Sequence, residues 1–383
     1  MLIVFALVFA YTYSDVATGS TSYNYAGTSR TVSHILLALT ILCIVICAML
    51  FKTKEARGYG PYMPILLAMA GWTAFNCLVF RTPIWTAATY VGFTVWWMFT
   101  FLLMKRYCAE DLSDMRFVIA LCMLMLAFYV YEFVDTFNYA NSVVDKEYAV
   151  LNIVFRVLVF VPLIMLMRNG LLKNVLMALI AVLVCASLKR AALIAYPLML
   201  LVYVLVDGKI KGQPLNSFFR LVLLFALIML VFAVADRYFG GYISVRFSEE
   251  QLEYGSGRIM RWTEAAEDIH QRGFMEFLVG SGIGSAGYAQ HNEWIEQMYS
   301  FGLVGFLLDM FFAIRLVSVF GFYYKKKSPL AAPYAALIMY FLVVGMVSGF
   351  MYMHSTLYLF IFAGICESRH PFGGVERVGN EKD

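Results

Sequence analysis

Charged residues are scarce in this chain. Of its 383 residues only 14% are Asp, Glu, Lys or Arg, whereas 62% are hydrophobic, and the mean hydropathy is +0.75. Soluble globular domains carry about 25% charged residues, so the composition excludes that class and indicates a polytopic membrane protein. The formal net charge of +4 lies mainly in short loops between apolar runs. Membrane topology accounts for it, and it gives no indication of nucleic-acid binding.

Cysteines and metal-ligand clusters are missing from the longest polar stretch, residues 237–292. All seven cysteines of the chain lie in apolar runs or in short basic loops. This excludes a disulfide framework or a thiolate metal site in the polar stretch. His, Asp and Glu do not cluster there at ligand spacing either, so we expect no metal site.

A nucleotide-binding lysine is also missing. The glycine-rich run GSGIGSAG, residues 280–287, has neither the lysine nor the strand–turn–helix context of a phosphate-binding loop, so we expect no nucleotide cofactor. We interpret the run as a tightly turning backbone whose exposed amides could approach a phosphate.

Apolar runs that can cross a hydrocarbon core of about 30 Å fill most of the chain. They lie near residues 31–51, 62–80, 84–104, 116–134, 150–168, 171–187, 190–206, 218–236, 294–320, 330–350 and 352–367. Residues 1–13 form a shorter twelfth run. It could instead be a signal peptide, but no basic region precedes it and no clear cleavage site follows, so we expect a span.

The distribution of Lys and Arg predicts the orientation of these spans, because short cytoplasmic loops retain positive charge. Basic residues gather in alternate loops, for example at 52–57, 105–116 and 325–327. With twelve spans, both termini are then cytoplasmic and residues 237–292 lie outside. We see no internal repeat and no appended soluble domain. The prediction is one membrane domain, residues 1–383, with one long outer loop, residues 237–292.

Part of this outer loop has the pattern of a short helix. Ser256 is a plausible N-cap, and Arg258 and Arg261 follow on the first turn. Apolar residues recur at a spacing that lines one helix face: Ile259, Trp262, Ala266 and Ile269. We therefore expect an amphipathic helix that lies on the outer membrane surface.

The presence of ionisable residues within or beside the spans requires an explanation, because inserting one such side chain at the middle of a bilayer costs about 2.5–3.5 kcal/mol of free energy. For Arg156 and Asp309 we expect structural pairing rather than a site role. Lys189 and Arg190 stand at an outer boundary, where positive charge is unusual. Their simplest interpretation is that both side chains reach the lipid headgroups.

The outer loop carries an unusual set of cations. Its arginines are Arg237, Arg246, Arg258, Arg261 and Arg272. Guanidinium groups hold phosphate in a bidentate fork, so the set suits an anionic ligand such as a lipid diphosphate. Alternatively, the arginines pair with the glutamates and aspartate of the same loop.

His291 stands where this loop meets a long apolar run. A pKa near neutrality suits a histidine to accept a proton from a hydroxyl. The alternative is a hydrogen-bonded interfacial residue without a catalytic role.

Five short motifs occur in a characteristic order. They are the run ASLKRAALIAYPLML at residues 186–200, the R-x-x-x-W of Arg258–Trp262, the glycine stretch, the pair His291–Asn292, and the run FGLVG at residues 301–305. In this order, on the expected outer face, they resemble the O-antigen polymerase and ligase superfamily. The resemblance covers about residues 185–320, a third of the chain.

The resemblance implies an all-α polytopic fold with about twelve transmembrane helices and one long periplasmic loop containing short helices, similar to GT-C glycosyltransferases. It implies a bacterial inner-membrane enzyme that moves saccharide from undecaprenyl diphosphate to a sugar hydroxyl at the periplasmic face, without metal or nucleotide sugar. Lipid-linked oligosaccharides are then donor and acceptor, and a chain-length regulator is a further expected partner.

The resemblance also assigns roles to residues. Arg190 and Arg258 match the arginines expected to hold the diphosphate, and His291 matches the expected general base. The remaining candidates for substrate contacts are Arg261, Arg246, Lys189 and Asn292. The first motif of the family is more often Ser-Arg. Here Leu188 and Lys189 intervene, so either Lys189 or Arg190 is the functional cation.

Two related activities and one unrelated activity fit these features. The compact outer loop favours a polymerase, which joins one lipid-linked chain to another, over a ligase, which moves the finished chain to lipid A core. A solute transporter is less favoured, because transporters carry broken helices and mid-membrane charges in both halves. Here the polar residues gather at one outer face.

Overall fold

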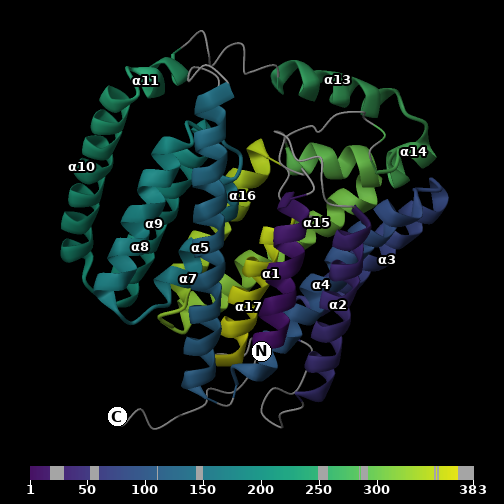
Figure 1. The fold of residues 1–383 in the computed structure, drawn as a ribbon, viewed down its shortest axis with the longest axis horizontal. Coiled ribbons are helices and arrows are strands. Elements are labelled where there is room, and N and C mark those ends of the chain that lie inside the picture. Colours follow the sequence, from purple (N-terminus) through teal and green to yellow (C-terminus); the bar gives the residue numbers. More distant parts are fainter. Residues whose placement is uncertain are drawn as a thin grey trace. The chain divides into compact units, whose positions relative to one another are not determined.

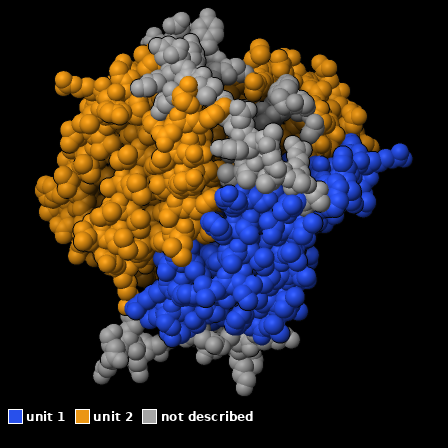
Figure 2. All heavy atoms as spheres, viewed as in Figure 1, with its two compact units in different colours: residues 1–122, 307–315, 352–383 blue, residues 123–306, 316–351 orange. Residues whose placement is uncertain are grey.

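The computed structural model describes residues 1–17, 30–51, 60–109, 111–143, 150–248, 258–283, 285, 292–348, 351 and 353–369. Helices account for most of these residues, and no strand occurs among them. The expected all-α class is therefore confirmed (Figure 1). The chain divides into two compact units, coloured separately in Figure 2.

The first unit comprises residues 1–122, 307–315 and 352–383. Its helices are α1 (Leu2–Ala17), α2 (Arg30–Leu50), α3 (Met63–Val79), α4 (Ile84–Tyr107), the 3-10 helix η2 (His354–Thr356) and α17 (Leu357–Arg369). Helix α4 is central and packs against α2, α3 and α17. Trp97 on α4 is fully buried and stacks on Phe360 of α17 at 5.5 Å between ring centroids. Gly364 allows this approach, because a Cβ there would meet the backbone of α4.

The second unit comprises residues 123–306 and 316–351. Its helices are α6 (Val154–Leu158), α7 (Val161–Met165), α8 (Gly170–Ala186), α9 (Arg190–Ile210), α10 (Pro214–Tyr238), α11 (Tyr242–Arg246), α13 (Arg258–Gln271), α14 (Phe274–Val279) and α16 (Ala331–Val347). Helices α5 (Leu112–Val143) and α15 (Glu293–Lys325) contribute to both units. Within the second unit α16 packs along α9, which also contacts α10.

Six of the described helices are long and apolar enough to cross a membrane: α2, α4, α5, α9, α10 and α15. Shorter apolar helices cover other expected runs, among them α1, α3, α8 and α16. The protein is therefore an all-α membrane protein by the length and composition of its helices. A total of twelve spans stays a prediction.

One expected span, residues 150–168, forms two short helices instead of one. Helices α6 and α7 meet at Val159–Phe160, and the amide of Phe160 donates to Val157 O at 3.2 Å, a 3-10 type bond. Pro162 explains the interruption, since it has no N–H to donate and its ring crowds the carbonyl of Leu158. The apolar pattern alone does not reveal such a break.

Arg156 on α6 has the pairing role that we expected. Its Nη1 donates to Glu132 Oε1 on α5 at 2.6 Å, and the two side chains are only 12% and 4% exposed. A second expected pairing residue, Asp309, is fully buried on α15.

Removing one member of the Arg156–Glu132 pair should be costly. Glu132→Gln leaves the guanidinium buried without its carboxylate, and we expect a loss of about 3–5 kcal/mol of stability. The double variant Glu132→Leu, Arg156→Met buries no charge and should lose much less. Equilibrium unfolding in mixed micelles compares them; equal losses for the two variants would contradict a charge-based role.

Candidate functional site

Helix α13 carries two of the expected phosphate-binding arginines on its protein-facing side. Arg258, Arg261 and Trp262 are partly buried, and Ala265 is 2% exposed. These positions recur at three- and four-residue spacing, which places them on one helix face. The two arginines are therefore partly covered by protein, and each takes part in an interaction. In Figure 1, α13 runs crosswise to α10.

The expected helix in the outer loop is present as α13, over residues 258–271. Of its predicted apolar face, Ile259 and Ala266 are exposed, and Trp262 and Ile269 are partly buried. That this face lies on the membrane surface stays a prediction. Ser256, the expected N-cap, lies outside the described residues.

Large apolar side chains point away from the protein on α13 and α14. Ile259 and Met260 are 53% and 62% exposed, and Phe274 and Met275 are 74% and 67% exposed. Such a combination, with polar residues on the same short helices, is typical of a segment that lies at a membrane interface. It agrees with the surface position expected for this loop.

Arg272 fastens the end of α13 to α15. Its guanidinium donates to Tyr299 O at 2.8 Å, lies 4.1 Å from the centroid of the Tyr299 ring, and pairs with Asp268 at 3.0 Å. Arg272 thus has the structural pairing role that we weighed as the alternative to phosphate binding. Hydrogen bonds from Arg272 and then Tyr299 lower the pKa of Asp268. The carboxylate therefore stays charged, and the contribution of this pairing to stability is lost only as the pH falls through the lowered pKa.

A crossing of two backbones holds the glycine stretch against α15. The helix is broken at Gly302, which has φ 68° and ψ −170°. A Cβ on Gly302 would meet the backbone of Leu278 and Gly280, and a Cβ on Gly280 would meet that of Ser300 and Gly302. Only glycine fits both positions, because both also have positive φ.

The break in α15 also corrects one expectation for the glycine stretch. The turning backbone is confirmed, since Gly280 and Gly282 have φ 86° and 88°. However, the amides of Ser281 and Gly282 donate to Tyr299 O and Ser300 O at 3.0 Å each. The broken helix leaves these carbonyls without intrahelical donors, so the two amides serve α15 and do not face a phosphate.

Asn292 begins α15 and joins it to α16. Its Oδ1 accepts from the amides of Trp294 and Ile295 at 3.0 and 3.2 Å, and its Nδ2 donates to Met346 O at 3.1 Å. The sequence predicted an orienting neighbour of His291. The structure shows a helix N-cap that also fixes the junction to a second helix.

Glu293 is a buried residue of this junction that sequence reasoning missed. It is 2% exposed, its Oε1 accepts from Gln297 Nε2 at 2.9 Å, and its Oε2 accepts from the amide of Met351 at 3.1 Å. A carboxylate directly after His-Asn, at the start of an apolar run, was the available signal. The bond from Met351 holds the chain beyond α16 next to the start of α15, and the bond from Gln297, one turn along α15, orients the carboxylate.

The turn between α8 and α9 orients Lys189 inward. Leu188 has φ 51° although it is not glycine, and Lys189 is only 8% exposed. The Nζ of Lys189 donates to Asn152 Oδ1 and lies 5.7 Å from the centroid of the Phe155 ring. The expected contact of Lys189 with lipid headgroups does not fit this buried ammonium, and its contact with a diphosphate stays a prediction. Arg190, the first residue of α9, is partly buried.

Helix α16 lies close to both the turn before α9 and the start of α15. The carbonyl of Phe155, whose ring centroid lies 5.7 Å from Lys189 Nζ, accepts a hydrogen bond from Tyr340 Oη at 3.2 Å. Asn292 Nδ2 donates to the carbonyl of Met346. Met346 follows Tyr340 by six residues, about 9 Å along a helix axis. The starts of α9 and α15 therefore lie against the C-terminal half of the same helix.

Other expected site residues are not placed. His291 lies outside the described residues, and so does the side chain of Arg246, the last residue of α11. No group of three His, Cys, Asp or Glu side chains that could hold a metal occurs among the residues searched, which are those the structure describes. Lys189, Arg190, Arg258 and Arg261 are cations that suit an anionic ligand, whereas the buried carboxylate of Glu293 is used in hydrogen bonds of the protein.

Comparisons with models of known protein families and with characterised proteins gave no match. The assignment of a function therefore depends on the residues themselves.

Gly302 offers a test of the backbone crossing. Gly302→Ala should destabilise the protein strongly, because a Cβ meets the Leu278 carbonyl and the residue has positive φ. Gly321→Ala, on the same helix, has open space and should be neutral or stabilise by up to about 1 kcal/mol. Thermal unfolding in detergent compares them, and equal midpoints would refute the crossing.

Asn292 offers a test of the junction to α16. Asn292→Asp keeps the cap but replaces the donor to Met346 O by an oxygen, whereas Asn292→Ala loses both. Loss of a cap alone costs about 1 kcal/mol, and Asn169→Ala at the start of α8 is the matched control. We expect a larger loss for Asn292→Ala than for Asn169→Ala in unfolding experiments, with Asn292→Asp also destabilised. A fully stable Asn292→Asp would contradict the contact to α16.

Proposed function

We propose that this protein is a membrane glycosyltransferase that polymerises lipid-linked saccharide units, transferring saccharide from undecaprenyl diphosphate to a sugar hydroxyl of a second lipid-linked unit. The observation that carries the proposal is that the start of α9 and the start of α15 both lie near the C-terminal half of α16. These two helix starts belong to the motif at residues 186–200 and to the His291–Asn292 motif.

The cationic groups support an anionic donor. Lys189 is buried beside the start of α9, Arg190 begins that helix, and Arg258 faces inward from α13. In a site shielded from water, fixed cations stabilise the charge that develops on a departing diphosphate. Of the two neighbouring cations, Arg190 is the better candidate for the diphosphate, because Lys189 is only 8% exposed whereas Arg190 is partly exposed.

The proposed mechanism is a single displacement. His291 removes the proton from the acceptor hydroxyl as its oxygen attacks the anomeric carbon, and the bond from that carbon to the diphosphate oxygen breaks. The electron pair leaves with the diphosphate, whose charge the arginines balance, and the anomeric configuration inverts. Asn292, which follows His291 in the sequence, is fixed as the N-cap of α15.

The test uses purified protein in detergent with EDTA, given undecaprenyl-diphosphate repeat units, and products are resolved on a gel. A positioned base contributes about 10²–10⁴-fold, so His291→Ala should lose the product ladder while still binding the donor. Arg258→Gln should weaken both. His270→Ala, an exposed histidine on α13, is the matched control and should retain the ladder.

Other outcomes identify the alternatives. Transfer that appears only after lipid A core is added would make the protein a ligase. No transfer with either acceptor would contradict the enzyme proposal and favour a solute transporter. A ladder that survives in His291→Ala would remove the base assignment.

A further inference from the structure

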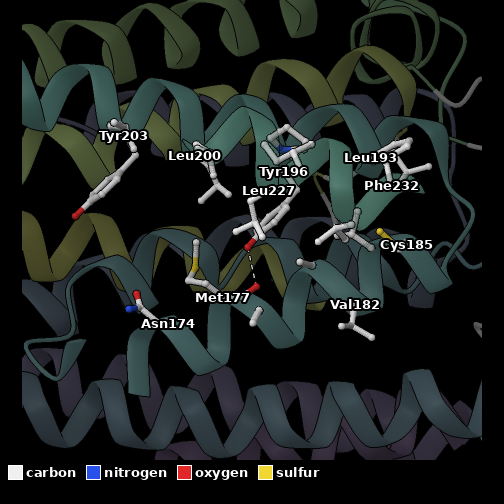
Figure 3. Close-up of a pocket in the computed structure, with 18 of the residues that line it drawn as sticks. Asn174, Met177, Val182, Cys185, Leu193, Tyr196, Leu200, Tyr203, Leu227 and Phe232 are labelled. Carbon is white, nitrogen blue, oxygen red and sulfur yellow. Dashed lines mark hydrogen bonds between the residues drawn. The ribbon is translucent and has the colours of Figure 1, made fainter. Parts of the chain in front are cut away.

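A cavity of about 600 Å³ lies within the second unit, between α8, α9 and α10. Its lining is almost entirely aliphatic and aromatic. Figure 3 shows Tyr203 and Asn174 at one end and Leu193, Cys185 and Phe232 at the other. In the middle, Tyr196 Oη donates to Met177 O at 2.7 Å, so this hydroxyl is already satisfied by the protein.

Helices α9 and α10 meet closely at one end of the cavity. Gly208 of α9 is in contact with Ser217 of α10, and a side chain at Gly208 would collide with it. Asp207 adds ion pairs to Lys211 at 2.9 Å and to Arg220 of α10 at 3.7 Å. Farther along α9 the interior Pro197 interrupts the helix hydrogen bonds and lines the widened space.

The cavity opens toward the surroundings of the protein. Val182 of α8 lines it and is 61% exposed, and Leu227 of α10 lines it and is 53% exposed. Exposed aliphatic side chains of this kind on membrane helices face hydrocarbon. A lipid chain can therefore enter sideways between α8 and α10.

One end of the cavity is cationic. Lys173 lines it, lies 5.8 Å from the centroid of the Tyr203 ring, and is 3.5 Å from Met165 O. Within the described part of the chain no carboxylate pairs with Lys173. Exposed cations lie beyond it at the same end: Lys209, Lys211 and Arg220. Asp207 balances only part of this charge, so the end of the cavity attracts anions.

The length of the cavity matches one leaflet. Lys173 and Cys185 are twelve residues apart on α8, which is about 18 Å of helix. Half of a hydrocarbon core of about 30 Å is about 15 Å. A chain whose headgroup lies at Lys173 would therefore occupy the cavity over the depth of one leaflet.

We propose that the cavity binds one acyl chain of an anionic phospholipid, with the lipid phosphate at Lys173. The inference is independent of the proposed transferase activity. By the distribution of basic loops, Lys173 lies on the cytoplasmic side, so the ligand comes from the cytoplasmic leaflet. Its phosphate is then at the opposite end of α8 from Ser187–Arg190.

The test uses the full chain, delipidated in detergent, with phosphatidylglycerol and phosphatidylcholine of identical acyl chains as probes and bound lipid counted by native mass spectrometry. A lysine near an anionic lipid contributes about fivefold in affinity. We expect phosphatidylglycerol to bind about fivefold more tightly than phosphatidylcholine, and Lys173→Gln to remove this preference. Lys209→Gln, which changes an exposed lysine at the same end, should retain it.

A second pair of variants tests the chain. Ala181→Phe fills the cavity and should abolish binding of both lipids, whereas Leu179→Phe, on α8 but outside the lining, should not. Unchanged binding in Ala181→Phe would overturn the proposal. So would equal effects of Lys173→Gln and Lys209→Gln, which indicate diffuse surface charge, or binding of glycerol 3-phosphate as tight as that of the lipid, which indicates a headgroup site without a chain.

Discussion

The contact between the backbones at Gly280 and Gly302 decides where the outer segment of the second unit lies. A helix that breaks inside the protein leaves buried carbonyls that need other donors. Ser281, Gly282 and Arg272 supply these donors to Tyr299 and Ser300. The segment that carries Arg258 and Arg261 is thereby fixed to the same helix that begins at Asn292.

Helix α16 provides the second fixed surface of the candidate site. The Tyr340 hydroxyl donates to the carbonyl of Phe155 near Lys189, and the Met346 carbonyl accepts from Asn292. Just beyond the helix, the amide of Met351 donates to Glu293. Each of these contacts joins one polar side chain to a backbone carbonyl or amide, so it fixes the backbone on one side of the contact directly. Rigid support of this kind suits the orientation of the lipid-linked substrate that we propose.

The sequence predicted the helices well and the site only in part. Apolar runs locate the helices because burial and lipid exposure both require hydrophobic side chains, but Pro162 divides one run. The break at Gly302 was not predictable, since glycine is tolerated within helices and its partner Gly280 is distant in the sequence. The left-handed conformation of Leu188 determines that Lys189 is buried, and no sequence pattern indicates it.

The lengths of neighbouring helices in the second unit differ in a way that affects the bilayer. Helices α8 and α16 have 17 residues each, whereas α10 has 25. At 1.5 Å per residue the shorter helices measure about 26 Å and the longer one about 38 Å. Where they cross the same membrane, α10 has to tilt and the hydrocarbon beside α8 has to become thinner. A thinner bilayer at this point shortens the path between the polar group of a bound lipid and water.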